Sequence, residues 1–196
     1  MKLNIVPART GYTWAKLGVQ TFFKQPLALA GLFFMFMAVL SVAAFLPYLG
    51  SALALSLLPA ATLGLMAATL ESTRGKFPMP SILISAFKAG QQRKRAMLML
   101  GLMYAVAFLG IMGLTALIDG GQFARLYLQG GKISAELVSQ ADFQLAMWAA
   151  MLMYLPLSLL FWHAPALVHW HRVSPVKSLF FSLLACWANK GAMLVY

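Results

Sequence analysis

Apolar residues in this chain fall in long uninterrupted blocks, and these blocks constrain the fold more than any other feature. The first block runs from Leu27 to Leu46, between Pro26 and Pro47. At about 1.5 Å per helical residue, a block of this length crosses the hydrocarbon core of a bilayer. Three further blocks follow, at Ser51–Leu70, Ala96–Ile118 and Phe143–Trp162. The sequence therefore predicts an all-α polytopic membrane bundle with four full transmembrane helices.

The composition agrees with this interpretation. Hydrophobic residues make up 62% of the 196 residues and charged residues only 10%, whereas about a quarter of the residues in a soluble domain are charged. A water-soluble fold of this size would have too few charges to cover its surface. The single cysteine, Cys186, excludes an intrachain disulfide. No cofactor-binding motif is found, and we expect no cofactor.

Amphipathic stretches and polar segments connect the predicted spans. Residues Ser81–Gln92 are expected to form an interfacial helix, with an apolar stripe made of Ile82, Leu83, Ala86 and Phe87. Val176–Ala188 is expected to form a second helix of this kind. In the long polar segment 119–142 we expect two short helices, at Gln122–Gln129 and Ser134–Gln140.

The last third of the chain leaves alternatives open. Span four either ends at Trp162 or continues past Pro165, kinked, as far as Trp170. Lys190–Tyr196 resembles the start of a fifth span, but seven residues are too few to cross a bilayer. We therefore expect either that the natural chain continues beyond Tyr196 or that this end packs half-inserted.

Lysine and arginine residues alternate between the two sides of the predicted spans. Thirteen of the fifteen lie on the side of the N-terminus, and Arg125 and Lys132 lie between spans three and four. Because basic loops are retained in the cytoplasm, we predict a cytoplasmic or interfacial N-terminal segment (1–25) and a periplasmic segment (119–142). The chain is then a single transmembrane domain of a bacterial inner membrane.

The net charge of +11 would suggest nucleic-acid binding in a soluble protein. Here the basic residues lie at the ends of apolar blocks, which favours contact with anionic lipid headgroups. We expect no nucleic-acid partner. The predicted headgroup contacts are Lys24, Arg93, Lys94, Arg95, Arg172 and Lys190.

One arrangement occurs three times: an amphipathic stretch, then basic or amide residues, then an apolar segment. The copies begin at Trp14, Ile82 and Val176, and around the third stand the motifs HAPALV (163–168), SPVKSL (174–179) and WANKGA (187–192). Through these motifs the chain resembles an uncharacterised family of proteobacterial inner-membrane proteins. It is more distantly similar to YciC-like proteins and to the membrane domain attached to some glycerophosphodiester phosphodiesterases. The resemblance implies a helical bundle, of six spans when complete, and no established reaction.

Three histidines, His163, His169 and His171, lie near the predicted cytoplasmic edge of span four. On a continuous helix the last two would project about 200° apart, so we expect no shared metal ion. Headgroup contact is the favoured role, and a proton-relay or metal role for His163 is the alternative. No acidic residue lies in the middle of a span, which argues against an ion-coupled transporter.

Small residues recur at every fourth position of span two. Such stripes let helices approach closely in lipid, where burial from water no longer drives association. We expect this stripe to pack inside the bundle or, alternatively, to form a docking face for another subunit. Its members are Ala52, Ser56, Ala60, Gly64 and Ala68.

Together these features favour a non-enzymatic accessory, scaffold or assembly protein. Its expected partners are membrane lipids and other integral membrane proteins or further copies of itself. The alternative is a transporter or permease-like protein for a lipid or apolar solute, with the breaks at Pro59 and Pro165 as mobile elements. A membrane enzyme is the third possibility.

Overall fold

The computed structural model of the protein describes residues 3–46 and 49–196. All secondary-structure elements assigned in these two ranges are helices. Four segments are long and apolar enough to cross a membrane: α2 (Pro26–Ala44), α3 (Gly50–Thr73), α5 (Gln91–Asp119) and α8 with α9 (Ala141–His171). The predicted all-α bundle with four spans is confirmed. Lys2 and the turn at Pro47 lie outside the described residues.

Local backbone rules set the ends of the spans. α2 begins with Pro26, whose missing N–H falls where a helix makes no internal bond. α5 begins after Gly90, with a φ of 98°, and ends at Gly120, with a φ of 65°. Glycine adopts both conformations without a steric penalty. α5 therefore extends over 29 residues and includes the basic run that precedes the predicted start at Ala96.

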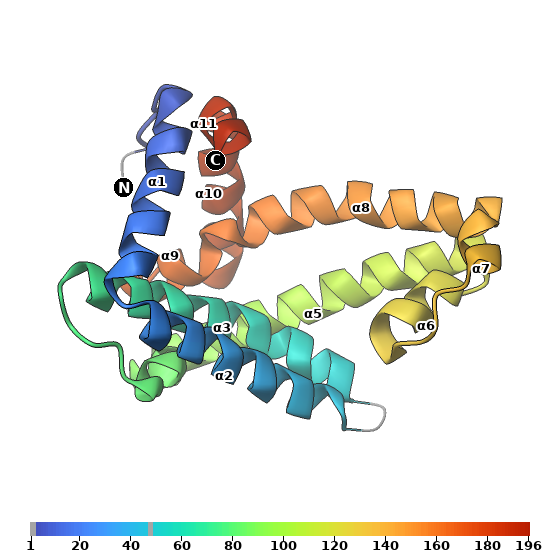
Figure 1. Ribbon diagram of the computed structural model, residues 1–196, viewed down its shortest axis with the longest axis horizontal. Coiled ribbons are helices and arrows are strands. Elements are labelled where there is room, and N and C mark those ends of the chain that lie inside the picture. The colour runs from blue at the N-terminus through green and yellow to red at the C-terminus, as the bar shows by residue number, and fades with distance from the viewer. Residues whose placement is uncertain (1–2, 47–48) are drawn as a thin grey trace.

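α5 lies at the centre of the bundle. It packs along α3 on one side and α8 on the other, and α2 packs against α3. Figure 1 shows α5 and α8 running side by side, and the short helices α6 (Gln122–Gln129) and α7 (Ala135–Ser139) lie where they meet. These two helices match the pair expected in the polar segment 119–142.

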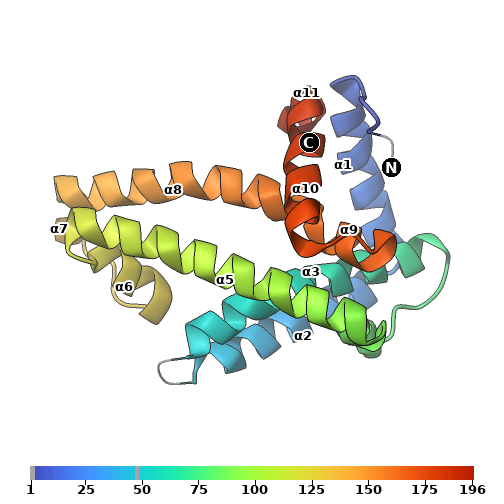
Figure 2. The same cartoon turned by 180° about the vertical axis from the view of Figure 1, so that it is seen from behind.

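Three helices run across the direction of the spans at the other end of the molecule. α1 (Arg9–Lys24), α10 (Pro175–Ala188) and α11 (Lys190–Val195) stand upright there in both views (Figures 1 and 2). We call this side the basic end. The basic residues of its three helices, of the segment 74–90, of the first turn of α5 and of the α9–α10 turn are Arg9, Lys16, Lys24, Arg74, Lys76, Lys88, Arg93, Lys94, Arg95, Arg172, Lys177 and Lys190.

The stretch Ser81–Gln92 is broken, so the prediction of one interfacial helix was wrong. A 3₁₀ helix, η1 (Pro80–Ile84), is followed by a single α-helical turn, α4 (Ser85–Lys88). The positive φ of Gly90 then turns the chain into α5. Periodicity alone misses the change from 3₁₀ to α-helix, because the apolar residues keep their helical spacing through it.

Two clusters of buried apolar residues lie along α5. The first lies toward the basic end and joins α3, α4, α5 and α9 through Ala60, Leu63, Ala86, Met97, Leu100, Ala164 and Val168. The second joins α5 to α8 through Phe108, Ile111, Met112, Ala150 and Leu157. The first cluster connects elements that are far apart in the sequence, so it positions the site described below.

A bend separates α8 (Ala141–Trp162) from α9 (Ala164–His171), in agreement with the kinked alternative for span four. The Ser182 hydroxyl of α10 accepts the His163 N–H (2.9 Å) and donates to the Leu159 carbonyl (2.8 Å). It therefore stands between the two groups that an unbroken α-helix would pair directly. An inserted side chain and a proline two residues later both bend a helix.

Candidate functional site

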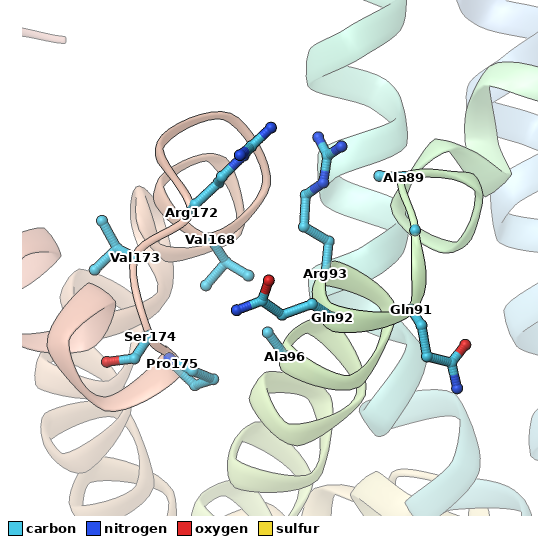
Figure 3. Close-up of a pocket in the computed structure, with 11 residues that line it drawn as sticks. Ala89, Gln91, Gln92, Arg93, Ala96, Val168, Arg172, Val173, Ser174 and Pro175 are labelled. Atoms are coloured by element: carbon cyan, nitrogen blue, oxygen red, sulfur yellow. The ribbon is translucent and has the colours of Figure 1, made fainter.

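A pocket of about 420 Å³ opens at the basic end, and we call it the arginine pocket. One wall is the α4–α5 junction, residues 89–93 with Ala96. The other is the turn between α9 and α10, residues 172–175 with Val168. Figure 3 shows Arg93 and Arg172 extending toward the same side, while Gln92 points across the pocket toward the turn.

Each wall of the pocket is shaped by its local sequence. Gly90 turns the chain so that Gln91 and Gln92 begin α5 directly beside the pocket. On the other wall, Arg172 ends α9 in the left-handed conformation, with a φ of 54°. The N–H of Val173 then donates to the Leu167 carbonyl (3.2 Å), which closes the helix end. Pro175 begins α10 immediately afterwards.

The arginine pocket is positive and polar above an apolar floor. Its lining includes two arginines, two glutamines and the hydroxyl-bearing Ser174, and none of the lining residues is acidic. Arg93 is half-buried and Arg172 is exposed. Guanidinium groups present planar forks of donors that match phosphate and carboxylate oxygens. The chemistry of the pocket therefore suits an anionic group that carries several oxygens.

The other predicted headgroup residues lie outside this pocket. Lys24, Lys94, Arg95 and Lys190 are exposed. The Lys190 ammonium lies 5.5 Å from the centre of the Trp187 ring, a distance at which cation–π attraction acts. Of the six predicted contacts, the structure brings only Arg93 and Arg172 together in one cavity.

The small-residue stripe of α3 faces other parts of this chain. Ala60, Gly64 and Ala68 are buried, and Ala52 and Ser56 are half-buried. A Cβ on Gly64 would lie 2.7 Å from the Leu83 Cα, and a Cβ on Gly101 would collide with the Ser56 carbonyl oxygen. The stripe thus makes close backbone contacts with η1 and α5.

The histidines are divided between two surroundings. His163 and His171 line a second pocket, of about 600 Å³, together with Asn4 and Asn189. The His169 ring is half-buried, and its Nδ1 has no hydrogen-bond partner. No group of three or more His, Cys, Asp or Glu side chains that could hold a metal is found among the described residues.

Several positioning residues were missed from the sequence, because their roles depend on distant partners. Besides Ser182, Cys186 on α10 is buried with its Sγ 3.8 Å from the Leu159 carbonyl oxygen, and burial raises the pKa of this thiol. Asn189 accepts the Val6 N–H at 2.8 Å and donates to the Asn4 carbonyl at 3.0 Å. A serine or asparagine at a helix junction does not reveal such contacts in the sequence.

A third cavity lies within the spans. It has a volume of about 400 Å³ and is lined by both Pro59 and Pro165. Its polar side chains include Thr62, Tyr104 and Tyr154. Pro59 lies inside a continuous α3, whereas Pro165 lies in the first turn of α9, just after the bend.

Comparison with known proteins supports a membrane location. The whole chain aligns over 199 positions, at 37% identity, with a probable inner membrane protein of Burkholderia thailandensis, and it covers 74% of that protein. No protein-family model matches the chain. No solved structure matches it either. The chain belongs to the family of this probable inner membrane protein, and its own four span-length helices support a multi-pass location in the membrane.

Proposed function

We propose that the protein is a non-enzymatic accessory or assembly protein of the inner membrane, with its N-terminus and basic end in the cytoplasm. In this role it binds anionic lipids at the basic end and other membrane proteins at the exposed faces of its spans. The observation that carries the proposal is the set of crosswise helices at the basic end (Figure 1). The finer resemblance to YciC-like proteins stays a prediction.

The surface of α1 supports lipid binding at this end. Leu17, Val19 and Phe23 are exposed together with Lys16 and Lys24 on the same helix. A helix that exposes both apolar and basic side chains lies in the headgroup region, where it buries the former and keeps the latter near anionic lipids. α1 is therefore suited to lie along one membrane surface.

The rest of the chain buries some spans much less than others, and this difference supports binding of another membrane protein. Only 11% of the apolar window of α2 is buried, against 44% of that of α5. α2 exposes Phe33 and Phe34, which contact each other edge to face. Aromatic side chains supply large contact areas in interfaces. We therefore assign the partner-binding role to the outer face of α2.

Photocrosslinking in bacterial membranes tests the partner role. A photoreactive amino acid at Phe34 of α2 is expected to give a discrete protein adduct. The same residue at Leu152 of α8 or Val106 of α5, which are exposed to a similar degree, is expected to give lipid adducts only. Lipid adducts at all three positions would contradict the accessory role. Cysteine accessibility on the two sides of the membrane tests the orientation.

A transporter or permease-like protein for an apolar solute is the second candidate. The specific observation in its favour is the cavity that both Pro59 and Pro165 line. This candidate predicts solute flux in liposomes that contain the purified protein. Flux that is abolished by Tyr104→Trp, a substitution that fills the cavity, would favour it over the accessory role.

A further inference from the structure

The arginine pocket differs from the rest of the basic end because two arginines line one hollow there. The exposed Lys94 and Arg95 belong to the same helical turn as Arg93, but they do not line the pocket. We propose that the arginine pocket is a site for one phosphate group, that of an anionic phospholipid whose headgroup enters between α5 and the α9–α10 turn. This inference rests on the proposed lipid-binding role and names its ligand chemistry.

The donors of the pocket suit a phosphate. Arg93 comes from the first turn of α5 and Arg172 from the end of α9, and both side chains extend toward the same side (Figure 3). Two guanidinium groups held by separate elements can grip different oxygens of one phosphate. Gln92 and Ser174 supply further neutral donors, and no lining carboxylate competes for the guanidinium groups.

The floor of the pocket suits the rest of a lipid headgroup. Ala96, Val168, Val173 and Pro175 are apolar lining residues. Val168 belongs to the first apolar cluster and Ala96 packs against it, so the floor is part of the packed bundle. A volume of about 420 Å³ has room for a phosphate and the glycerol carbons beside it. The pocket also lies at the end of two spans, where the phosphates of a leaflet are found.

The backbone of Arg172 provides an independent argument. Apart from glycines, it is the one residue with a positive φ in the ranges 3–46 and 49–196. A helix usually ends with glycine at such a position, because a Cβ is disfavoured there. The chain thus has an arginine where the backbone favours glycine, which is consistent with a use for the side chain.

The positive φ of Arg172 also suggests a substitution that removes the side chain without straining the backbone. Arg172→Gly removes the guanidinium group and leaves the residue that the backbone prefers, so the fold is expected to be at least as stable as before. Arg93→Gln removes the second guanidinium group. Arg95→Gln is the matched control, because it removes the same charge from the same helix outside the pocket.

The experiment measures lipid binding to the full chain in a mild uncharged detergent. Binding of phosphatidylglycerol and of zwitterionic phosphatidylcholine is titrated by native mass spectrometry, with inorganic phosphate as a soluble competitor. For phosphatidylglycerol, we expect Arg172→Gly and Arg93→Gln each to weaken apparent affinity at least tenfold and Arg95→Gln less than twofold. Thermal midpoints of unfolding, measured without lipid, identify any misfolded variant. If Arg93→Gln is misfolded, the comparison of Arg172→Gly with Arg95→Gln tests the proposal.

Each outcome has a defined meaning. If Arg172→Gly and Arg95→Gln weaken binding equally, phosphatidylglycerol binds through diffuse charge, and the pocket is refuted while the lipid-binding role stands. If the unaltered chain does not prefer phosphatidylglycerol to phosphatidylcholine, both are refuted. Inorganic phosphate that binds the unaltered chain and not Arg172→Gly, while both bind phosphatidylglycerol equally, would support the phosphate site but overturn its assignment to a lipid.

Discussion

The two halves of α5 make contact with their neighbours in different ways. In the first half, backbone approaches backbone: Gly101 lies against the Ser56 carbonyl of α3, and no side chain fits between them. In the second half, side chains fill the space, with Phe108 against both Tyr127 and Tyr154. Gly110 and Gly113 there have open space where a Cβ would stand. Close backbone packing leaves less freedom in the distance between two helices than aromatic packing does. The arginine pocket lies beside the first half of α5, where the backbones are close.

The largest expected effect comes from placing a methyl group in the backbone contact between α3 and α5. Gly101→Ala places a Cβ into the Ser56 carbonyl oxygen, so α3 and α5 must separate. We expect the free energy of unfolding to fall by about 3 kcal/mol, at the upper part of the range for overpacking. Unfolding of the purified protein in mild detergent measures this.

Gly110→Ala is the control on the same helix. Because nothing lies within 4 Å of its Cβ position, the change is expected to raise the free energy of unfolding by up to about 1 kcal/mol through helix propensity alone. Equal effects of Gly101→Ala and Gly110→Ala would mean that the two halves of α5 do not differ as described.

The bend between α8 and α9 gives the next largest effect. Ser182→Ala leaves the His163 N–H and the Leu159 carbonyl without the hydroxyl that joins them. We expect a loss of about 2 kcal/mol, within the range for buried groups that lose their partner. Ser158→Ala is the control, because that hydroxyl only donates to the Leu155 carbonyl of its own helix. A loss in the control as large as in Ser182→Ala would show that the inserted hydroxyl has no special role.

Much of this architecture could be predicted from the sequence, because it depends on properties of single segments. The spans follow from long apolar blocks, and the short helices at Gln122–Gln129 and Ala135–Ser139 follow from their flanking glycines and serine. The bend near Pro165 follows from proline chemistry. Each of these signals lies within a few residues of the feature that it predicts.

The arginine pocket could not be predicted, because its two arginines come from segments that only the fold brings together. The sequence placed Arg93 and Arg172 in one set of headgroup contacts but gave no reason to separate them from Lys94 or Arg95. The break at Gly90 was also missed, since glycine adopts positive and negative φ about equally readily and the sequence alone does not show which one the fold selects. Both features depend on how α4 and α9 each pack against α5.

The smallest effect is expected in the second half of α5, where α6 begins. The Asp119 carboxylate accepts the N–H groups of Gly121 (2.9 Å) and Phe123 (2.6 Å), so it caps the start of α6. Asp119→Ala is expected to cost about 1 kcal/mol, as is typical for loss of such a cap, and Asp119→Asn less, since one acceptor oxygen remains. Hydrogen exchange of the Phe123 amide should rise in Asp119→Ala, whereas the amides around Gly101 should keep their protection. Faster exchange at both places would mean that α5 unfolds as one unit, and its two halves would then differ in packing but not in stability.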